Sequence, residues 1–437
     1  MSLSTEHIIT LLKTPKFGQV SVKYINANIK YKISNLRELL DAINELKSYN
    51  SKLPIPNISD LENAFSNSEM IMSTAERKSI KILSCNDINY PIRLKRLNDY
   101  PSIIYYKGSL AAINAESSVA VIGTREPSIF GIKAGRRMAS IFADHGFSIV
   151  SGLAIGCDSA GHLGALDVGG QTVCVLANGV DIIYPKENTA LAERILEADG
   201  ALLSEYEPGA KAFRQSFVQR DRLQSGLSDG LIVLETDIKG GTMHTVGFAK
   251  NINIPIACLS GHPENLRDHP KTKGTQYLVN NGAIPLSNQN QIYSYLKLLN
   301  PNVIITKSDE GKNFSAVLEE RSKIEANIDV LDQLSNVSND FTADETEVQA
   351  SVKNDEMLPA KAKGSELAIP VNEIVPDKFV TLSEFRKVSE ELETVKRKLI
   401  LLEETLSEFN KVLPKLLKSP STKKEKKVED KEQPTLL

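Results

Sequence analysis

The stretch SVAVIGTREPSIFG (118–131) decides the fold, because a short apolar run ends in a glycine turn and leads into sequence of helical period. Six more apolar runs follow along the chain: FSIVSG (147–152), TVCVLANG (172–179), ALLSEY (201–206), GLIVLET (230–236), IPIACLS (254–260) and GAIPLS (282–287). Continuous apolar runs are typical of strands buried on both faces of a parallel sheet. Segments of helical period that end in glycine, such as 132–146 and 187–200, separate them. This alternation predicts an α/β fold with a doubly wound, mostly parallel, Rossmann-like sheet.

The chain before this region is expected to be helical. Apolar side chains in residues 1–85 recur at helical spacing, and the break TPKFGQ (14–19) indicates a turn between two helices. This small N-terminal domain could contact DNA or serve only in packing, and the sequence leaves both interpretations open. The Rossmann-like domain is then expected over residues 86–300.

Three segments of different character follow. Residues 301–378 are expected to form a disordered linker, because residues 307–378 carry 16 acidic and 8 basic side chains with few aromatics. Residues 379–414 carry apolar side chains at alternating spacings of three and four, which predicts a coiled-coil helix for self-association. An amphipathic helix docked on the protein's own core is the alternative. Residues 415–437 are expected to be a basic, disordered tail.

Charge, cysteines and hydropathy limit the class of protein. The net charge of −3 excludes a protein that is basic throughout, but residues 86–290 are almost neutral, with 19 basic and 20 acidic side chains. A local basic groove is therefore compatible with the composition. The four cysteines lack metal-ligand or redox spacing and predict buried thiols in a reducing compartment. With no signal-peptide pattern and no membrane-spanning apolar run, we expect a cytoplasmic protein without metal or cofactor.

Three glycine-bearing turns follow predicted strands, so they should lie at one edge of the parallel sheet, where open α/β folds bind ligands. The first turn combines backbone N–H groups, a helix N-terminus and Arg125, which can grip a phosphate with two hydrogen bonds. The second lies in 151–166, and the third in 239–245. Basic side chains from 204–222 add positive charge to the same edge. We therefore expect a groove with backbone N–H groups at its base and basic side chains along its rim. The candidate residues are Gly123, Thr124, Arg125, Ser128, Gly131, Gly152, Gly156, Lys211, Arg214, Arg220, Arg222, Gly240, Gly241 and Thr242.

A convincing catalytic set is missing from the sequence. Asp158 and His162 are four residues apart and could form an acid–base pair, although a helix cap and a packed imidazole are the simpler interpretation. Other motifs yield neither paired carboxylates nor a nucleophile with its base. The sequence therefore favours binding over catalysis.

Residues 90–287 resemble the DNA-processing protein A family (DprA, also called Smf). The matching segments are YPIRLKRLNDYPSIIYYKG, VAVIGTREPSIFG, IVSGLAIGCDSAGHLGAL, TVCVLANGVDIIYPKEN, LLSEYEPGAKAFRQSFVQRDR, KGGTMHT and GTQYLVNNGA. The resemblance implies a non-enzymatic, Rossmann-like domain that binds single-stranded DNA, dimerises and helps to load a RecA-type recombinase during DNA uptake or recombination. It also implies phosphate contacts from Gly123, Thr124, Arg125, Ser128, Phe130, Gly131, Lys211, Arg220 and Gly240–Thr242. Phe130 could in addition stack on a base if its ring is exposed.

Two departures from the family pattern stand out. The family's R-N-R is Arg220–Asp221–Arg222 in this chain, so a carboxylate replaces a neutral amide. A carboxylate facing the groove would repel phosphate, and a pair between it and a neighbouring arginine would reduce the positive charge of the groove. Many family members end in a winged helix, whereas here the predicted linker, coiled coil and tail follow the sheet domain.

A rival hypothesis is a nucleotide-binding or nucleotide-cleaving Rossmann-like enzyme or sensor, for example in a defence system. Related nucleotide-cleaving families carry a G-G-x-G-T turn followed by a glutamate. The corresponding stretch here, residues 240–244, reads GGTMH without a glutamate at that spacing. This difference favours DNA binding over nucleotide cleavage.

Overall fold

The computed structural model describes residues 3–305. The linker from residue 306 onward, the coiled-coil helix and the basic tail lie outside the described residues, so those expectations stay predictions. None of the helices within residues 3–305 is both long and apolar enough to cross a membrane.

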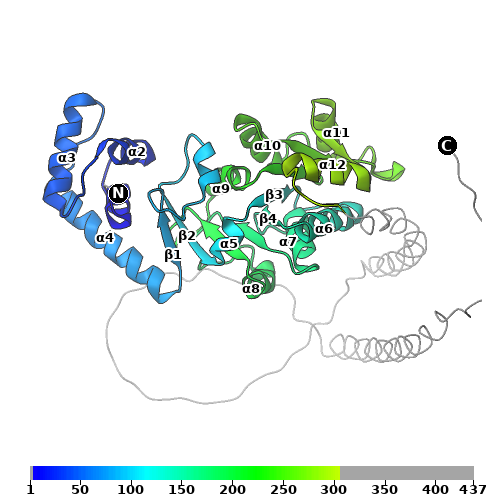
Figure 1. Cartoon of the computed structure of the whole chain (residues 1–437), viewed down its shortest axis with the longest axis horizontal. Coiled ribbons are helices and arrows are strands. Elements are labelled where there is room, and N and C mark those ends of the chain that lie inside the picture. Colours follow the sequence, from blue (N-terminus) through cyan, green and yellow to red (C-terminus); the bar gives the residue numbers. More distant parts are fainter. Residues whose placement is uncertain (1–2, 306–437) are drawn as a thin grey trace, which may run out of the picture. The chain divides into compact units, whose positions relative to one another are not determined.

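Four helices form the N-terminal part and lie beside the β1 end of the sheet (Figure 1). They are α1 (Thr5–Lys13), α2 (Gln19–Asn28), α3 (Leu36–Tyr49) and α4 (Ile58–Arg77). The side chains of Ser4, Asn35 and Asn57 accept hydrogen bonds from first-turn N–H groups of α1, α3 and α4, which explains where these helices begin. Thr10 of α1 donates to the Ser68 hydroxyl of α4 at 3.1 Å, in the buried contact between the two helices.

A nine-stranded sheet follows, in the order β1-β2-β6-β5-β4-β3-β7-β8-β9. The strands are β1 (Lys81–Ser84), β2 (Ile103–Gly108), β3 (Ser117–Ile122), β4 (Phe147–Ser151), β5 (Thr172–Val175), β6 (Ala201–Ser204), β7 (Gly230–Val233), β8 (Ile256–Leu259) and β9 (Ile284–Leu286). Strands β3 to β9 are parallel and coincide with the seven apolar runs. The sequence did not predict β1 and β2, which pair antiparallel at one edge, so the sheet begins before residue 86. The predicted doubly wound, mostly parallel α/β fold is confirmed.

Helices cover both faces of the sheet (Figure 1). They are α5 (Leu110–Ile113), α6 (Ile129–Asp144), α7 (Cys157–Leu166), α8 (Thr189–Glu197), α9 (Arg214–Leu227), α10 (Thr242–Asn251), α11 (Pro270–Asn280) and α12 (Gln289–Leu299), with the 3-10 helices η1 (Ile92–Arg96), η2 (Lys186–Asn188) and η3 (Glu264–Leu266). Neighbouring β3 residues enter opposite cores: Val121 packs in the same cluster as Phe142 of α6, and Ile122 in the cluster of Leu223 of α9. A strand with both faces buried is mostly apolar on both sides, which is why apolar residues run along these strands without alternation.

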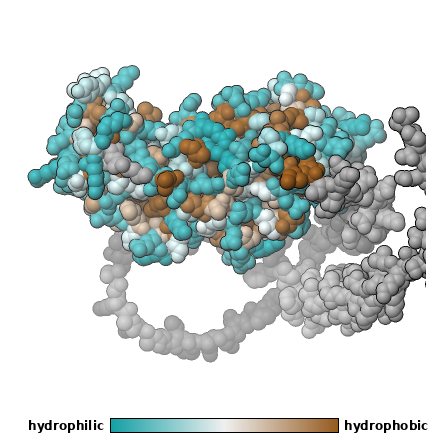
Figure 2. Space-filling model, in the orientation of Figure 1, coloured by the Kyte–Doolittle hydropathy of each residue, from teal (hydrophilic) through white to brown (hydrophobic). Residues whose placement is uncertain are grey.

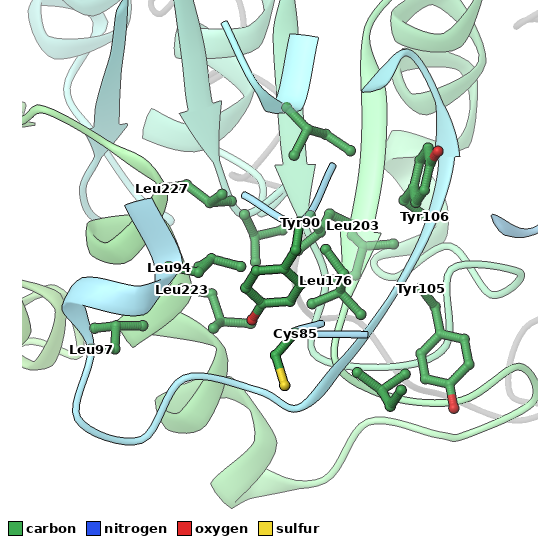
Figure 3. Packing of buried hydrophobic residues seen from close by; sticks show 14 of the residues in the cluster. Cys85, Tyr90, Leu94, Leu97, Tyr105, Tyr106, Leu176, Leu203, Leu223 and Leu227 are labelled. Atoms are coloured by element: carbon green, nitrogen blue, oxygen red, sulfur yellow. The ribbon is translucent and has the colours of Figure 1, made fainter. Parts of the chain in front are cut away.

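The hydrophobic core holds helix α9 in position, and other residues of the same helix line the groove described below. Figure 3 shows Leu94 and Leu97, from and just after η1, close to Leu223 and Leu227 of α9. All four side chains are buried. On the face drawn in Figure 2, by contrast, hydrophobic residues form separate patches between hydrophilic ones. Scattered exposed apolar residues of this kind are normal on folded proteins.

Candidate nucleic-acid interface

A groove of about 490 Å³ lies at the carboxyl ends of β3 and β7. The chain runs from β3 through β4 and β5 to β6 on one side, then returns to β7 on the other side of β3. This reversal is the topological switch point at which open α/β sheets bind ligands. The walls of the groove come from the turn after β3, one side of α9, and the segment from the end of β7 into α10.

The turn after β3 places Arg125 in the groove. Thr124 is fixed at the sheet edge, because its N–H donates to the Glu235 carbonyl at 2.7 Å and its carbonyl accepts from Cys157 N–H at 3.1 Å. Arg125 itself is exposed, with its guanidinium carbon 5.5 Å from the ring centroid of Phe217 on α9. Gly123 and Thr124 also line the groove. The structure thus brings together this part of the predicted phosphate site.

The N-terminus of α6, by contrast, is occupied by a side chain of the protein. Ser128 donates to the fully buried Glu235 carboxylate twice, through its N–H at 2.7 Å and its hydroxyl at 2.6 Å. A Cβ on Gly131 would meet the same carboxylate at 2.5 Å, so glycine is needed for this close approach. Burial alone would raise the pKa of Glu235, but hydrogen bonds from His262 and Ser128 lower it overall. Ser128 therefore binds the Glu235 carboxylate and Gly131 leaves room for it, contrary to the expectation that these two residues face a phosphate.

Phe130 is directed into the core and not into the groove. Its side chain is buried, and its ring centroid lies 5.0 Å from that of His262. A base cannot stack on a ring that is covered in this way. The condition for Phe130 to stack on a base, an exposed ring, is therefore not met in this structure.

Arg220 lines the groove but is largely buried, and it has a structural task. Its Nη1 donates to the carbonyls of Gly152 at 2.8 Å and Val175 at 2.7 Å, which ties the ends of β4 and β5 to α9. A side chain at Gly152 would collide with this guanidinium, so Gly152 makes room for Arg220 and does not line the main groove. Gly156, with φ of 85°, begins the following helix outside the groove.

Arg222 and Lys211 lie outside the groove lining. Arg222 is buried and forms ion pairs with Glu205 at 2.6 Å and with Asp99 at 2.9 Å, away from the turns after β3 and β7. Lys211 is exposed in the loop between β6 and α9, and Arg214 is exposed at the start of α9. Among the described residues, neither of these two side chains lines the groove.

The turn after β7 keeps its helix N-terminus open. Gly240, Gly241 and Thr242 all line the groove, and α10 begins at Thr242. Within residues 3–305, no side chain caps this end of α10. The N–H groups of Met243 and His244 donate to the carbonyls of Gly240 and Gly241, so this end offers an anion the N–H groups of Gly241 and Thr242 and the positive end of the helix dipole. Lys271, at the start of α11, adds a positive charge to the same wall.

Asp158 and His162 do not form a catalytic pair. Asp158 accepts from the N–H groups of Gly152 at 3.1 Å and Ala154 at 3.3 Å, so it fixes the turn before α7 and does not cap that helix. His162 is fully buried, with Nδ1 2.7 Å from the Thr172 hydroxyl, and burial lowers its pKa to about 3. The described residues also contain no cluster of three or more potential metal ligands.

Several groove residues were not predicted from the sequence. Phe217 and Gln224 line the groove from α9, and His244 lines it from α10. The spacing of Phe217, Asp221 and Gln224 is i, i+4 and i+7, which is one face of a helix and could have revealed them. Asp221 does line the groove. Burial raises the pKa of Asp221 to about 6, against the opposing effect of Arg220.

The comparisons with known proteins agree with this architecture. The family described as DNA recombination-mediator protein A matches residues 81–297. Protein Smf of Synechocystis sp. (strain ATCC 27184 / PCC 6803 / Kazusa) is 34% identical over 224 residues, 51% of this chain and 55% of that protein. Protein Smf of Escherichia coli (strain K12) is 34% identical over 208 residues, 48% of this chain and 54% of that protein. This chain thus spans about half the length of these two relatives.

A solved structure extends the similarity to the fold. The X-ray structure of DNA processing protein A (DprA) from Streptococcus pneumoniae superimposes with a TM-score of 0.55 and 24% identity, and covers 70% of this chain and 100% of that chain. The family match, the sequence relatives and this common fold lead to one conclusion: the chain belongs to the DNA recombination-mediator protein A family, the DprA/Smf proteins.

Proposed function

We propose that this protein binds single-stranded DNA, without cleaving it, in the groove at the carboxyl ends of β3 and β7, and that it acts in DNA processing or recombination. The observation that carries the proposal is the exposed Arg125 guanidinium above the Phe217 ring. The guanidinium can bind a phosphate, and by turning toward the strand it leaves the face of the Phe217 ring to a base, a combination of cation and aromatic ring that is typical of single-strand binding. The names of the related proteins, which concern DNA processing and recombination, support the same function.

Aromatic side chains at the groove favour single strands over duplex DNA. Phe217 is half-buried, and its ring lies 5.7 Å from that of Tyr184, whose side chain is 48% exposed. The two rings line a second hollow of about 250 Å³ that shares Arg125 and Phe217 with the groove. Only unpaired bases can lay their faces on such rings, because bases in a duplex are already stacked and paired.

The groove geometry supports a specific set of phosphate contacts. Arg125 and Lys271 supply positive charge, and the uncapped N-terminus of α10 at Gly241–Thr242 supplies N–H donors. Lys271 lies 3.5 Å from the exposed Glu126, an ion pair that solvent screens and a phosphate can displace. Lys211 lies outside this set and would contact DNA only where the strand continues past the groove.

Charge reversal with a matched control tests the proposal. Arg125→Glu should weaken binding to a fluorescent oligo-dT by at least about tenfold, because it replaces an attraction with a repulsion at the phosphate. Lys133→Glu makes the same charge change on the exposed side of α6, outside the groove lining, and should change affinity by less than about twofold. Anisotropy titrations at two salt concentrations measure both, with duplex DNA, RNA and mononucleotides as competitors. Equal effects of the two variants would exclude this groove as the binding site.

Two partners belong to the same proposal. A RecA-type recombinase and a second copy of this chain are the partners that the family resemblance implies. Co-sedimentation with recombinase filaments on single-stranded DNA tests the first, and light scattering of the full chain tests the second. A chain that is monomeric at all concentrations and absent from the filament pellet would rule out both.

A further inference from the structure

The side of α9 that lines the groove carries three residues in one row. Phe217, Asp221 and Gln224 follow each other at i, i+4 and i+7, and all three line the groove. Side chains at this spacing are neighbours on a helix surface. A base held at the Phe217 ring would therefore lie beside the Asp221 carboxylate and the Gln224 amide on the same face of α9.

The Asp221 carboxylate has hydrogen-bonding capacity to spare. Its Oδ1 accepts from Nε of Arg220 at 3.2 Å, and this is its hydrogen bond within the described part of the chain. Arg220 bonds only this one oxygen, because its Nη1 donates to the carbonyls of Gly152 and Val175, so within residues 3–305 Oδ2 accepts no hydrogen bond. With 15% of its side chain exposed, Asp221 reaches the groove while Arg220 holds it from behind.

An ionised carboxylate can only accept hydrogen bonds, so it distinguishes base edges by their donors. Guanine offers two adjacent donors, N1–H and the N2 amino group, which match two carboxylate oxygens. Cytosine and adenine offer one exocyclic amino group each. Thymine offers a single N–H between two carbonyl oxygens, which the carboxylate repels. An asparagine at this position, as in the family's R-N-R pattern, could donate as well as accept and would tolerate all four bases.

From this arrangement we infer that Asp221 makes the groove selective for the base stacked on Phe217, with guanine preferred and thymine disfavoured. The inference rests on the proposed function, because it requires DNA in this groove. It assigns Asp221 two opposite effects: repulsion of phosphates for every sequence, and a compensating hydrogen bond only for bases with a donor edge. Specificity of this kind arises as much from the rejected base as from the favoured one.

Four oligonucleotides test the inference: 15-residue oligo-dT, and the same strand with a single central dG, dA or dC, which avoids guanine-quadruplex formation. The full chain should bind the dG strand at least about fivefold more tightly than oligo-dT in anisotropy titrations at pH 8. In Asp221→Asn that ratio should fall to below about twofold, while the affinity for oligo-dT itself should rise. The substitution preserves side-chain shape, so a folded variant is expected.

A second groove carboxylate provides the matched control. Asp237, on the opposite wall, lines the groove at the end of β7. Asp237→Asn removes the same charge and should raise the affinity for all four strands alike, leaving the preference for dG intact. Equal binding of the four strands by the unaltered protein, or a dG preference that survives in Asp221→Asn, would overturn the inference. Failure of the proposed function looks different: no binding of single strands, or binding that Arg125→Glu leaves unchanged.

Discussion

Two helices, α6 and α10, begin at the same edge of the sheet after glycine-bearing turns, yet only one of them is open to a ligand. The N-terminus of α6 is filled by the buried Glu235 carboxylate, which accepts two hydrogen bonds from Ser128. The N-terminus of α10 has no side-chain cap and lines the groove. A glycine turn followed by a helix therefore indicates an anion site, but the anion can be a residue of the protein itself.

The largest expected effect is a loss of stability when the Glu235 carboxylate is removed from the N-terminus of α6. Glu235→Ala leaves the Ser128 N–H, the Ser128 hydroxyl and His262 without their buried acceptor. We expect the free energy of unfolding to fall by about 3 kcal/mol, as measured by chemical denaturation at pH 7.5.

A nearby acidic residue serves as the control for that loss. Asp237→Ala, two residues further along in a partly exposed position, should cost about 0.5 kcal/mol or less. If both variants lost equal stability, Glu235 would not be the internal anion that closes α6. In that case the distinction between a filled N-terminus of α6 and an open N-terminus of α10 would not hold.

The next prediction concerns a substitution that places a negative charge at the open N-terminus of α10. Gly241 has ordinary helical dihedral angles, and a Cβ there would meet no atom within 4 Å, so Gly241→Asp places a carboxylate at the α10 N-terminus without a clash. Affinity for oligo-dT should fall by about tenfold, because the new negative charge repels phosphate from this helix N-terminus. The stability of the protein should change little, since Gly241 is exposed with a helical backbone and a negative charge at a helix N-terminus interacts favourably with the dipole.

Gly241→Ala separates charge from bulk at this position. It adds a Cβ without a carboxylate, so its affinity for oligo-dT should stay within about twofold of the unaltered protein. Should alanine weaken binding as much as aspartate does, steric exclusion would replace the electrostatic explanation. An unchanged affinity in Gly241→Asp would mean that DNA does not use this helix end.

Local sequence was sufficient for most of the sheet, but not for its antiparallel edge. The strands β3 to β9 are apolar because both of their faces are buried, and that pattern is visible in the sequence. The strands β1 and β2 precede the alternating strands and helices and pair antiparallel. The alternation that predicted the other strands therefore does not include them. Their place was therefore learned only from the structure.

The candidate site was predicted only where a residue's role is local. Arg125 follows directly from its turn, whereas the partner that occupies Ser128 lies 107 residues away, on a segment after another strand. Arg222 illustrates a different limit: it is two positions after Arg220, hence about 200° around the helix, so the two cannot face the same groove. That error could have been avoided from spacing alone, whereas the role of Glu235 required the tertiary structure.

The smallest expected effect concerns pH and compares the two sides of the groove. Burial raises the pKa of Asp221 to about 6, opposed by Arg220 on the same helix and His244 on α10, and supported by Asp158 on α7. Above pH 6 the ionised carboxylate repels phosphate, and below it the protonated acid does not. Affinity for oligo-dT should therefore rise as pH falls from 8 to 5, by about threefold more in the unaltered protein than in Asp221→Asn. His244 is present in both proteins, so the difference between their anisotropy curves isolates the contribution of Asp221. Parallel curves for the two proteins would mean that the charge of the Asp221 carboxylate does not affect DNA binding. The affinity would then depend on Arg125 and the open N-terminus of α10.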